Sequence, residues 1–275
     1  MTHVRVDRLT KEFPFDDGAR LRALEDLSFE IDDGEFIGVL GRSGCGKSTL
    51  LRILAGLDSA TRGAVEIRAD DSGRGRQPTA MVFQEHVLFP WRTVLGNVTF
   101  GLEEQRVPRA EREARAHELI RLVGLAGHER HYPKSLSSGM RQRVGIARAL
   151  AVDPDVLLMD EPTASLDAQT KMELQDELVR IWAETGKTVV YVTHDVDEAV
   201  YLADRVLMLS PHPGRLQTTL PIELPRPRDR VSPEFTELKG ELLHRLTDRA
   251  AHDELGTTRD GAEPDRRLIS TGGSA

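Results

Sequence analysis

The stretch of sequence that decides the fold is residues 41–48, which read Gly41-Arg42-Ser43-Gly44-Cys45-Gly46-Lys47-Ser48. Its spacing matches the phosphate-binding pattern G-x-x-x-x-G-K-[ST]. Residues 35–40 before it form a short, mostly apolar run that predicts a buried strand. Residues 48–55 after it have the pattern of a helix that ends at Gly56. Because the pattern requires this order of strand, glycine-rich turn and helix, the stretch predicts a site for nucleotide phosphates.

The residue types in this stretch suit the triphosphate of a nucleotide. Glycines let backbone N–H groups converge on phosphate oxygens, and the helix N-terminus adds partial positive charge. We expect Lys47 to reach the β- and γ-phosphates and the hydroxyl of Ser48 to bind Mg²⁺. Cys45 is expected to contribute its backbone N–H and not its thiol. The predicted phosphate-binding set is Gly41, Arg42, Ser43, Gly44, Cys45, Gly46, Lys47, Ser48 and Thr49.

Two later strand patterns end in residues that suit phosphate chemistry. The apolar run 156–159 is followed by Asp160 and Glu161, and the run 188–193 is followed by His194. In an open parallel sheet, ligands bind at the carboxyl ends of the strands. We expect Asp160 to hold Mg²⁺ and Glu161 to accept a proton from the water that attacks the γ-phosphate. His194 is expected to contact the γ-phosphate and orient that water.

The rest of the chain alternates between strand and helix patterns. Residues 3–9 and 24–31 alternate polar and apolar side chains, which predicts a mainly β beginning. Residues 108–123 and 140–151 have apolar side chains at helical spacing, so the middle third is predicted to be a helical insertion. After it, strand and helix patterns alternate again. This order predicts an α/β fold with a parallel sheet and crossover helices.

Length and composition exclude several classes of protein. The chain has 275 residues, of which 39% are hydrophobic and 30% charged, so wholesale disorder and fibrous rods are excluded. The formal net charge of -8 gives no support to nucleic-acid binding. No run approaches the roughly 18 apolar residues of a membrane span, and the N-terminus lacks the apolar core of a signal peptide. With one cysteine and no internal disulfide, a soluble protein of the cytosol is expected.

Taken together, these motifs resemble those of the ATP-binding subunits of ABC transporters. The most specific segment is Leu136-Ser137-Ser138-Gly139-Met140-Arg141-Gln142-Arg143, which resembles the family signature L-S-G-G-Q and precedes a predicted helix. The resemblance implies ATP and Mg²⁺ as cofactors. It also implies a P-loop NTPase fold, in which a RecA-like core carries an antiparallel β subdomain and an inserted α-helical subdomain.

In this family two copies lie head to tail, so that the signature of one copy faces the γ-phosphate held by the other. The residues that match this contact are Ser137, Ser138, Gly139 and Met140. Ser138 stands where glycine is usual. Because serine is small and is tolerated at helix starts, we expect function to survive this departure.

Three further family elements follow from the resemblance. Gln84 matches the Q-loop glutamine, which contacts Mg²⁺ and links the site to the helical insertion. Ser165, Leu166 and Asp167 resemble the D-loop. Phe13 matches the aromatic residue that stacks on adenine, but Phe15 is close enough to be the platform instead. Either side chain could also belong to the core.

Residues 84–94 are similar to the Q-loop region of importers for nitrate, sulfonates and taurine, with Pro90-Trp91 as the distinctive part. This likeness implies an importer of a small anionic solute, with an aliphatic sulfonate favoured and taurine or nitrate next. A coupling helix of a separate permease would dock in a groove lined by residues 85–104. The docking residues are expected to be Leu88, Phe89, Pro90 and Trp91. Internal packing of these side chains is the alternative.

The implied assembly is a homodimer of ATPase subunits on two permease subunits, with an extracytoplasmic solute-binding protein as an indirect partner. Its place is peripheral, at the cytoplasmic face of the cell membrane. The expected division is a catalytic core with the β subdomain at residues 1–84 and 153–245, and a helical subdomain at 85–152. Residues 246–275 are expected to be a disordered tail.

Two other functions remain open. One is a soluble ABC-type ATPase that acts on nucleic acid or ribosomes; the net charge of -8, the single cassette and the lack of a long coiled-coil insertion oppose it. The other is a P-loop kinase outside the ABC family, which would not carry the segment at 136–143.

Overall fold

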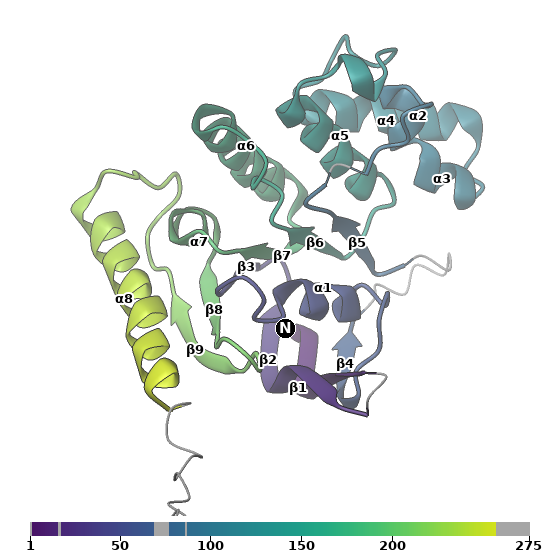
Figure 1. Cartoon of the computed structure of the whole chain (residues 1–275). Coiled ribbons are helices and arrows are strands. Elements are labelled where there is room, and N and C mark those ends of the chain that lie inside the picture. The colour runs from purple at the N-terminus through teal and green to yellow at the C-terminus, as the bar shows by residue number, and fades with distance from the viewer. Residues whose placement is uncertain (1, 16–17, 69–76, 86, 257–275) are drawn as a thin grey trace, which may run out of the picture.

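The computed structural model describes residues 2–15, 18–68, 77–85 and 87–256. They form two sheets with helices around them (Figure 1). The three-stranded antiparallel sheet has the order β2-β1-β4. Its strands are β1 (Thr2–Pro14), β2 (Arg20–Asp32) and β4 (Arg62–Ile67).

The six-stranded sheet has the order β5-β6-β7-β3-β8-β9. Its first five strands are parallel to their neighbours, and β9 pairs antiparallel with β8 at one edge. The strands are β3 (Phe36–Leu40), β5 (Thr79–Val82), β6 (Val156–Asp160), β7 (Thr188–Thr193), β8 (Arg205–Leu209) and β9 (Leu216–Pro221). The predicted α/β fold with a parallel sheet and an antiparallel β subdomain is therefore confirmed.

The helices fall into three groups (Figure 1). Helix α1 (Lys47–Leu54) lies between the two sheets, α6 (Ala168–Thr185) and α7 (Val196–Leu202) cover the other face of the parallel sheet, and α8 (Pro233–Gly256) packs on α7. The helical group lies between β5 and β6 in the chain. It consists of α2 (Val94–Val98), α3 (Phe100–Glu104), α4 (Arg109–Leu122), the short 3₁₀ helix η1 (Pro133–Ser135) and α5 (Ser138–Ala151).

Strand β3 shows why the parallel sheet has a core on both faces. All five of its residues are buried. Ile37 and Val39 point to the core that contains α1 and the antiparallel sheet, whereas Phe36 and Leu40 point to the core that contains α6 and α7. Side chains of a strand alternate between faces, so a strand covered on both sides has a nearly continuous apolar sequence.

The C-terminal part of the chain differs from expectation. Helix α8 continues to Gly256, so residues 246–256, which were expected to belong to a disordered tail, are helical. Residues 247–255 contain no proline, the residue that breaks a helix most strongly, so the helix can continue through them. The rest of that tail, residues 257–275, lies outside the described residues.

Among the described helices, none is both long enough and apolar enough to cross a membrane.

Candidate active site

The topology brings three predicted site segments to one edge of the parallel sheet. Strands β6, β7 and β3 are neighbours and run in the same direction. Leu40 at the end of β3 is level with Thr193 at the end of β7, and Asp160 at the end of β6 is level with Val192. The residues that follow these strands therefore emerge side by side.

The loop after β3 leaves the first turn of α1 open to a ligand. The N-cap residue is Gly46, with a φ of 96°, and no side chain of the described chain hydrogen-bonds to the helix there. A Cβ atom on Gly46 would lie 2.8 Å from the backbone oxygen of Ala23, so glycine is required by both conformation and space. Since the first N–H groups of a helix have no partner within it, they are donors for an anion at this point.

Lys47 is held against the loop in which it lies. Its side chain is buried, and its Nζ donates to the backbone oxygens of Gly41 at 2.8 Å and Arg42 at 3.1 Å. The same Nζ is 3.6 Å from Oε1 of Glu161. The ammonium group is therefore fixed between the loop and the end of β6, where a phosphate would meet it.

Cys45 is packed inside the loop. It is 1% exposed, and a Cβ atom on Gly41 would lie 2.6 Å from its Sγ. Burial raises the pKa of the Cys45 thiol, against the smaller opposing effect of Lys47. The neutral thiol fills space behind the loop, in line with a predicted role for the backbone of Cys45 and not for its sulfur.

Ser48 and Asp160 form an oxygen-rich pair between α1 and β6. The hydroxyl of Ser48 donates to Oδ1 of Asp160 at 3.0 Å. Burial raises the pKa of the Asp160 carboxyl, and the hydrogen bond from Ser48 opposes this shift. A partly buried carboxylate next to a hydroxyl is a donor set that suits Mg²⁺, which prefers oxygen ligands. These two residues therefore fit the predicted ion.

Glu161 and His194 are in direct contact. Nδ1 of His194 lies 2.8 Å from Oε2 of Glu161, although the residues are 33 positions apart in the chain. Glu161 has a φ of 42°, a left-handed conformation that is uncommon for a residue with a side chain, and its backbone N–H donates to the oxygen of Val192 at 3.0 Å. Strained backbone of this kind is frequent at functional sites.

The signature segment lies at the start of α5, in the helical group. Ser137 is the N-cap, and its side chain accepts a hydrogen bond from the backbone N–H of Met140 at 3.2 Å. Gly139 is buried, and a Cβ atom there would lie 2.5 Å from Cγ2 of Thr170 in α6. In Figure 1 this end of the molecule is separate from α1, so the structure does not bring the signature segment to the phosphate loop of the same chain.

The remaining predicted site residues are exposed or half-buried. Asp167 is the N-cap of α6 and accepts from the backbone N–H of Thr170 at 3.0 Å; Ser165 is exposed and Leu166 half-buried. Gln84 follows β5 and is exposed. Phe13 is half-buried, with Nζ of Lys11 4.8 Å from its ring centre, and Phe15 is 54% exposed.

Neither phenylalanine belongs to the buried core of the described chain, which leaves both as candidates for stacking on a base.

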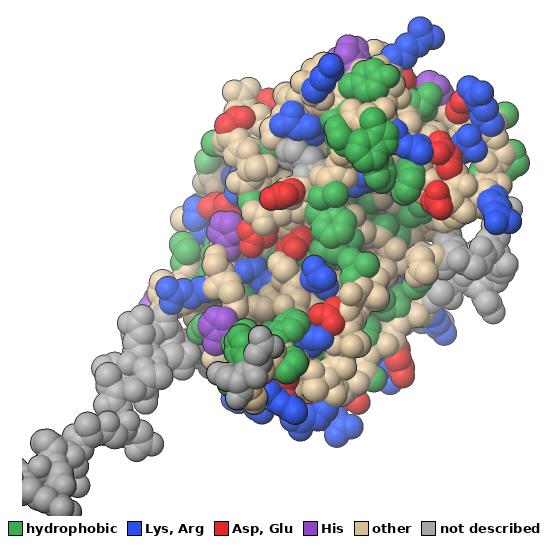
Figure 2. Space-filling model, turned by 45° about the vertical axis from the view of Figure 1, so that its right-hand side comes forward, with side chains coloured by type: hydrophobic (Ala, Val, Ile, Leu, Met, Phe, Trp, Pro, Cys, Tyr) green, Lys and Arg blue, Asp and Glu red, His purple; other side chains and the backbone are tan. Residues whose placement is uncertain are grey.

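The predicted docking residues combine packing with exposure. Trp91 is 72% exposed, whereas Leu88 and Phe89 are half-buried. The ring of Phe89 packs 5.6 Å from Trp91 and 4.5 Å from Phe100, measured between centroids. Figure 2 shows hydrophobic side chains gathered over the helical group on this face. Internal packing thus describes Phe89, whereas Trp91 projects from the loop, and docking of a permease on these residues stays a prediction.

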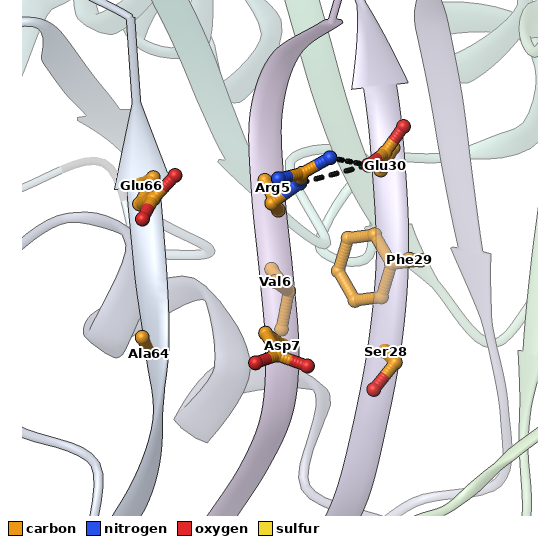
Figure 3. Close-up of a pocket in the computed structure, with 8 residues that line it drawn as sticks. All are labelled: Arg5, Val6, Asp7, Ser28, Phe29, Glu30, Ala64 and Glu66. Carbon is orange, nitrogen blue, oxygen red and sulfur yellow. Dashed lines mark hydrogen bonds and ion pairs between the residues drawn. The ribbon is translucent and has the colours of Figure 1, made fainter.

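A hollow of about 550 Å³ lies on the antiparallel sheet, away from these residues (Figure 3). It is crossed by an ion pair in which Nε of Arg5 donates to Oε1 of Glu30 at 2.8 Å. Its lining residues are Arg5, Val6, Asp7, Ser28, Phe29, Glu30, Ala64 and Glu66. None of them is a predicted site residue. The hollow is unsuited to binding a triphosphate, because its three acidic side chains outnumber its single arginine and would repel the phosphates.

A group of polar residues joined to the segments of Glu161 and His194 was not predicted from the sequence. The buried carboxylate of Glu198 in α7 forms an ion pair with the partly exposed ammonium of Lys171 in α6 at 3.0 Å. A glutamate among the apolar residues Val196, Ala199 and Val200 is a detectable signal once that segment is recognised as a helix. The segment is short, however, and no helix was predicted there.

Comparisons with known proteins agree with this geometry. Residues 24–164 match the sequence profile of the ABC transporter family. The chain is 52% identical over 250 residues to an uncharacterized ABC transporter ATP-binding protein of Methanocaldococcus jannaschii, covering 89% of this chain and 91% of that protein. It is 46% identical over 223 residues to an aliphatic sulfonates import ATP-binding protein of Bacillus licheniformis, covering 80% and 85%.

Among solved structures, the chain is similar to an ATP-binding cassette determined as a dimer in a post-hydrolysis state bound to ADP and Pi. The TM-score is 0.69 at 33% sequence identity, and the match covers 80% of this chain and 99% of the other. The predicted resemblance to ABC transporter ATP-binding subunits is therefore confirmed: this chain belongs to the ABC transporter family, and it is an ATPase of that family.

Proposed function

We propose that this chain is the ATPase subunit of an ABC importer that energises uptake of a small anionic solute through a separate permease. The observation that carries the catalytic part is the contact of Glu161 with both neighbours: His194 lies 2.8 Å away and the ammonium of Lys47 3.6 Å away. A carboxylate, an imidazole and a cation at the end of a phosphate loop are the groups that γ-phosphate hydrolysis needs.

In the proposed site, residues 41–49 and the N-terminus of α1 bind the triphosphate of ATP. Lys47 neutralises charge on the β- and γ-phosphates, and its present partners, two backbone oxygens, are weaker than a phosphate. Phe13 is proposed to stack on adenine. The support for Phe13 over Phe15 is that the ammonium of Lys11 lies 4.8 Å from the centre of the Phe13 ring and helps to fix that ring in place.

Mg²⁺ would be held by Ser48 and Asp160, with Gln84 as a further oxygen donor. When bound, the ion neutralises the charge of the phosphate oxygens. In this chain the hydrogen bond from Ser48 to Asp160 keeps the two oxygen ligands close together before an ion binds. Preassembled ligands of this kind reduce the ordering that binding requires.

Glu161 is proposed as the general base that accepts the proton of the attacking water. His194 orients the Glu161 carboxylate through Nδ1 and leaves Nε2 to contact the γ-phosphate. Its imidazole is half exposed, so it can reach a ligand in front of the loop. Together these groups position a water in line with the bond that breaks.

Two copies of the chain are proposed to bind head to tail. Ser137, Ser138, Gly139 and Met140 would then contact the ATP of the partner, and Ser165, Leu166 and Asp167 would lie between the two sites. Support comes from the dimeric cassette bound to ADP and Pi and from the position of the start of α5 apart from the phosphate loop of its own chain (Figure 1).

The proposed permease contact uses Leu88, Phe89, Pro90 and Trp91. An indole that is 72% exposed while its neighbour Phe89 is packed on Phe100 is a typical anchor for a partner. Two permease subunits at the membrane, with a solute-binding protein beyond them, would complete the assembly. This places the chain at the cytoplasmic face of the membrane. The relatives named for transport do not favour the alternative of an ATPase acting on nucleic acid or ribosomes.

The proposed units are the catalytic core with its β subdomain at residues 1–84 and 153–245, and the helical subdomain at 85–152. For the transported solute we propose an aliphatic sulfonate, supported by the sulfonate import relative at 46% identity. Taurine and nitrate are the next candidates. Growth of a deletion strain with each compound as the sole sulfur or nitrogen source tests this choice, and growth equal to wild type on sulfonates contradicts it.

The catalytic proposal is tested with Glu161→Gln. Without its base, hydrolysis is expected to fall about 10²- to 10⁴-fold, while the phosphate loop still binds ATP and the closed dimer accumulates. Hydrolysis is measured as phosphate release, nucleotide affinity by titration, and dimerisation by size-exclusion chromatography with Mg·ATP. Glu173→Gln, which changes an exposed carboxylate on α6, is the control. Turnover of Glu161→Gln at the wild-type rate would rule out Glu161 as the base.

A further inference from the structure

A buried carboxylate lies behind the proposed hydrolytic pair. Glu198, in α7, is 2% exposed. Its Oε1 accepts hydrogen bonds from Oγ1 of Thr163 and from Nε2 of Gln175 at 3.1 Å, and its Oε2 accepts from Oγ1 of Thr193 at 2.5 Å. A carboxylate is costly to bury unless it is paired and hydrogen-bonded. Moving any one of these donors away would leave the buried carboxylate less well hydrogen-bonded and would cost free energy.

The charge of Glu198 is compensated by one cation. Nζ of Lys171 lies 3.0 Å from Oε1 of Glu198 and donates to Oδ2 of Asp195 at 2.6 Å. Burial by itself would lower the pKa of the Lys171 ammonium, but the bonds to Asp195 and Glu198 outweigh it and raise that pKa. The ammonium thus remains charged between the two carboxylates.

The two threonines that donate to Glu198 lie next to the proposed catalytic groups: Thr163 is in the loop after β6, and Thr193 is the last residue of β7. Thr163 follows Glu161 by two residues, and Thr193 directly precedes His194. The hydroxyl of Thr193 also accepts from the backbone N–H of Asp195 at 2.9 Å, which closes the turn around His194. One carboxylate therefore holds the backbone on either side of the contact between Glu161 and His194.

The same carboxylate also reaches α6. Lys171 and Gln175 lie one and two turns after Asp167, the residue at the N-cap of that helix. In addition, the phenol of Tyr191, fully buried in β7, contacts the hydroxyl of Thr163 at 3.2 Å. The network joins β7, α6, α7 and the loop after β6 at a single point.

We propose that Glu198 is a positioning residue for ATP hydrolysis, which sets the Glu161 carboxylate and the His194 imidazole relative to each other through Thr163 and Thr193. Its side chain is buried, and it acts through the hydroxyls of these two threonines. This inference rests on the roles proposed for Glu161 and His194. A displacement of about 1 Å at a reacting group can lower a rate by about 100-fold, so a clamp of this kind has a measurable kinetic effect.

The test is Glu198→Gln, which keeps the size of the side chain but removes its charge and replaces one acceptor by a donor. We expect kcat for ATP hydrolysis to fall about 10- to 100-fold, whereas KM for Mg·ATP and the affinity for ATP change less than about twofold. The reason is that the network leaves Lys47 and Ser48 in place. Asp197→Asn is the matched control, because Asp197 is the neighbouring carboxylate on α7 and pairs with Lys239 near the surface. Its kcat is expected to equal that of wild type.

Combining two variants distinguishes a positioning role of Glu198 from a purely structural role in the core. In the Glu161→Gln background, Glu198→Gln is expected to lower the residual hydrolysis much less than it lowers that of the wild type, because one of the two groups that it positions is gone. An equal fold-loss in both backgrounds, or a loss of ATP affinity that matches the loss of kcat, would overturn the inference. Wild-type turnover of Glu161→Gln itself would instead contradict the proposed base, so the two failures are distinguishable.

If Glu198→Gln does not fold, Thr193 supplies a second test. Thr193→Val removes the hydroxyl at constant shape and is expected to lower kcat with KM unchanged, whereas Thr193→Ser retains the hydroxyl and is expected to restore kcat. Equal kcat values for the valine and serine variants would overturn the inference.

Discussion

Two helix N-termini in this chain are built in different ways. Helix α1 begins at Gly46, and no side chain of the described chain caps it. Helix α5 begins at Ser137, whose own hydroxyl accepts from the backbone N–H of Met140. The first helix leaves its N–H groups for an anion, while the second is stable without one. The N–H groups of an uncapped terminus lack partners until a ligand binds, whereas those of a capped terminus are partly satisfied before any partner binds.

The glycines at these two termini are constrained by different neighbours. A Cβ atom on Gly46 would meet the backbone oxygen of Ala23 at 2.8 Å, and backbone cannot give way cheaply. A Cβ atom on Gly139 would instead meet a methyl group, Cγ2 of Thr170, at 2.5 Å. Backbone therefore excludes a larger residue at Gly46 in the phosphate loop, whereas at Gly139 the space is limited by one side chain of α6, which a substitution can change.

The largest expected effect comes from removing the cation of the open terminus. Lys47→Ala is expected to lower hydrolysis at least about 10²- to 10³-fold, the loss typical when one group that stabilises transition-state charge is removed. ATP affinity is expected to fall as well, because the ammonium contacts the ground-state phosphates. Nucleotide titration and phosphate release measure both. Unchanged ATP affinity would show that Lys47 does not contact the phosphates, and it would contradict the proposal that the open terminus of α1 binds them.

A smaller effect is expected at the capped terminus, from Ser137→Ala. Loss of the cap is expected to cost about 1 kcal/mol of stability. Hydrolysis by the dimer is expected to fall about 10-fold or more, since a hydrogen bond to a charged phosphate contributes about 1.5–3 kcal/mol.

The distinguishing measurement is ATP binding by the single subunit, which should stay the same in Ser137→Ala. Ser138→Gly, which introduces the residue usual in the family, serves as the control and should change hydrolysis less than about threefold. If Ser137→Ala weakened ATP binding in the monomer, the signature would belong to the site of its own chain.

The smallest expected effect tests the contact with α6. Gly139→Ala is expected to destabilise the fold by about 1 kcal/mol, near the low end for overpacking, because a half-buried methyl group can shift. Thr170→Ser removes that methyl group and retains the hydroxyl that donates to Asp167.

The double variant should therefore regain the lost stability, measured as the midpoint of chemical unfolding. Additive losses in Gly139→Ala and Thr170→Ser would show that the two residues do not share this contact.

Much of the fold could be predicted because its signals are local. The apolar run at 156–159 became β6, and the periodic segments 108–123 and 140–151 became α4 and α5 within two residues at each end. The antiparallel edge strand β9 and the short helix α7 were missed. Five to seven residues carry too little periodicity to predict an element whose stability comes from its neighbours.

The candidate site, like the fold, has parts with local sequence signals and parts that depend on contacts between distant residues. The sequence alone determined the phosphate loop, because three closely spaced glycines and a lysine specify a backbone shape and a charge within eight residues. Only the tertiary structure decided that Glu161 meets His194, 33 positions away, and that Glu198 is buried beneath both. Burial and contact between distant residues depend on which strands become neighbours, and that is settled by packing across the whole sheet and not by any one segment.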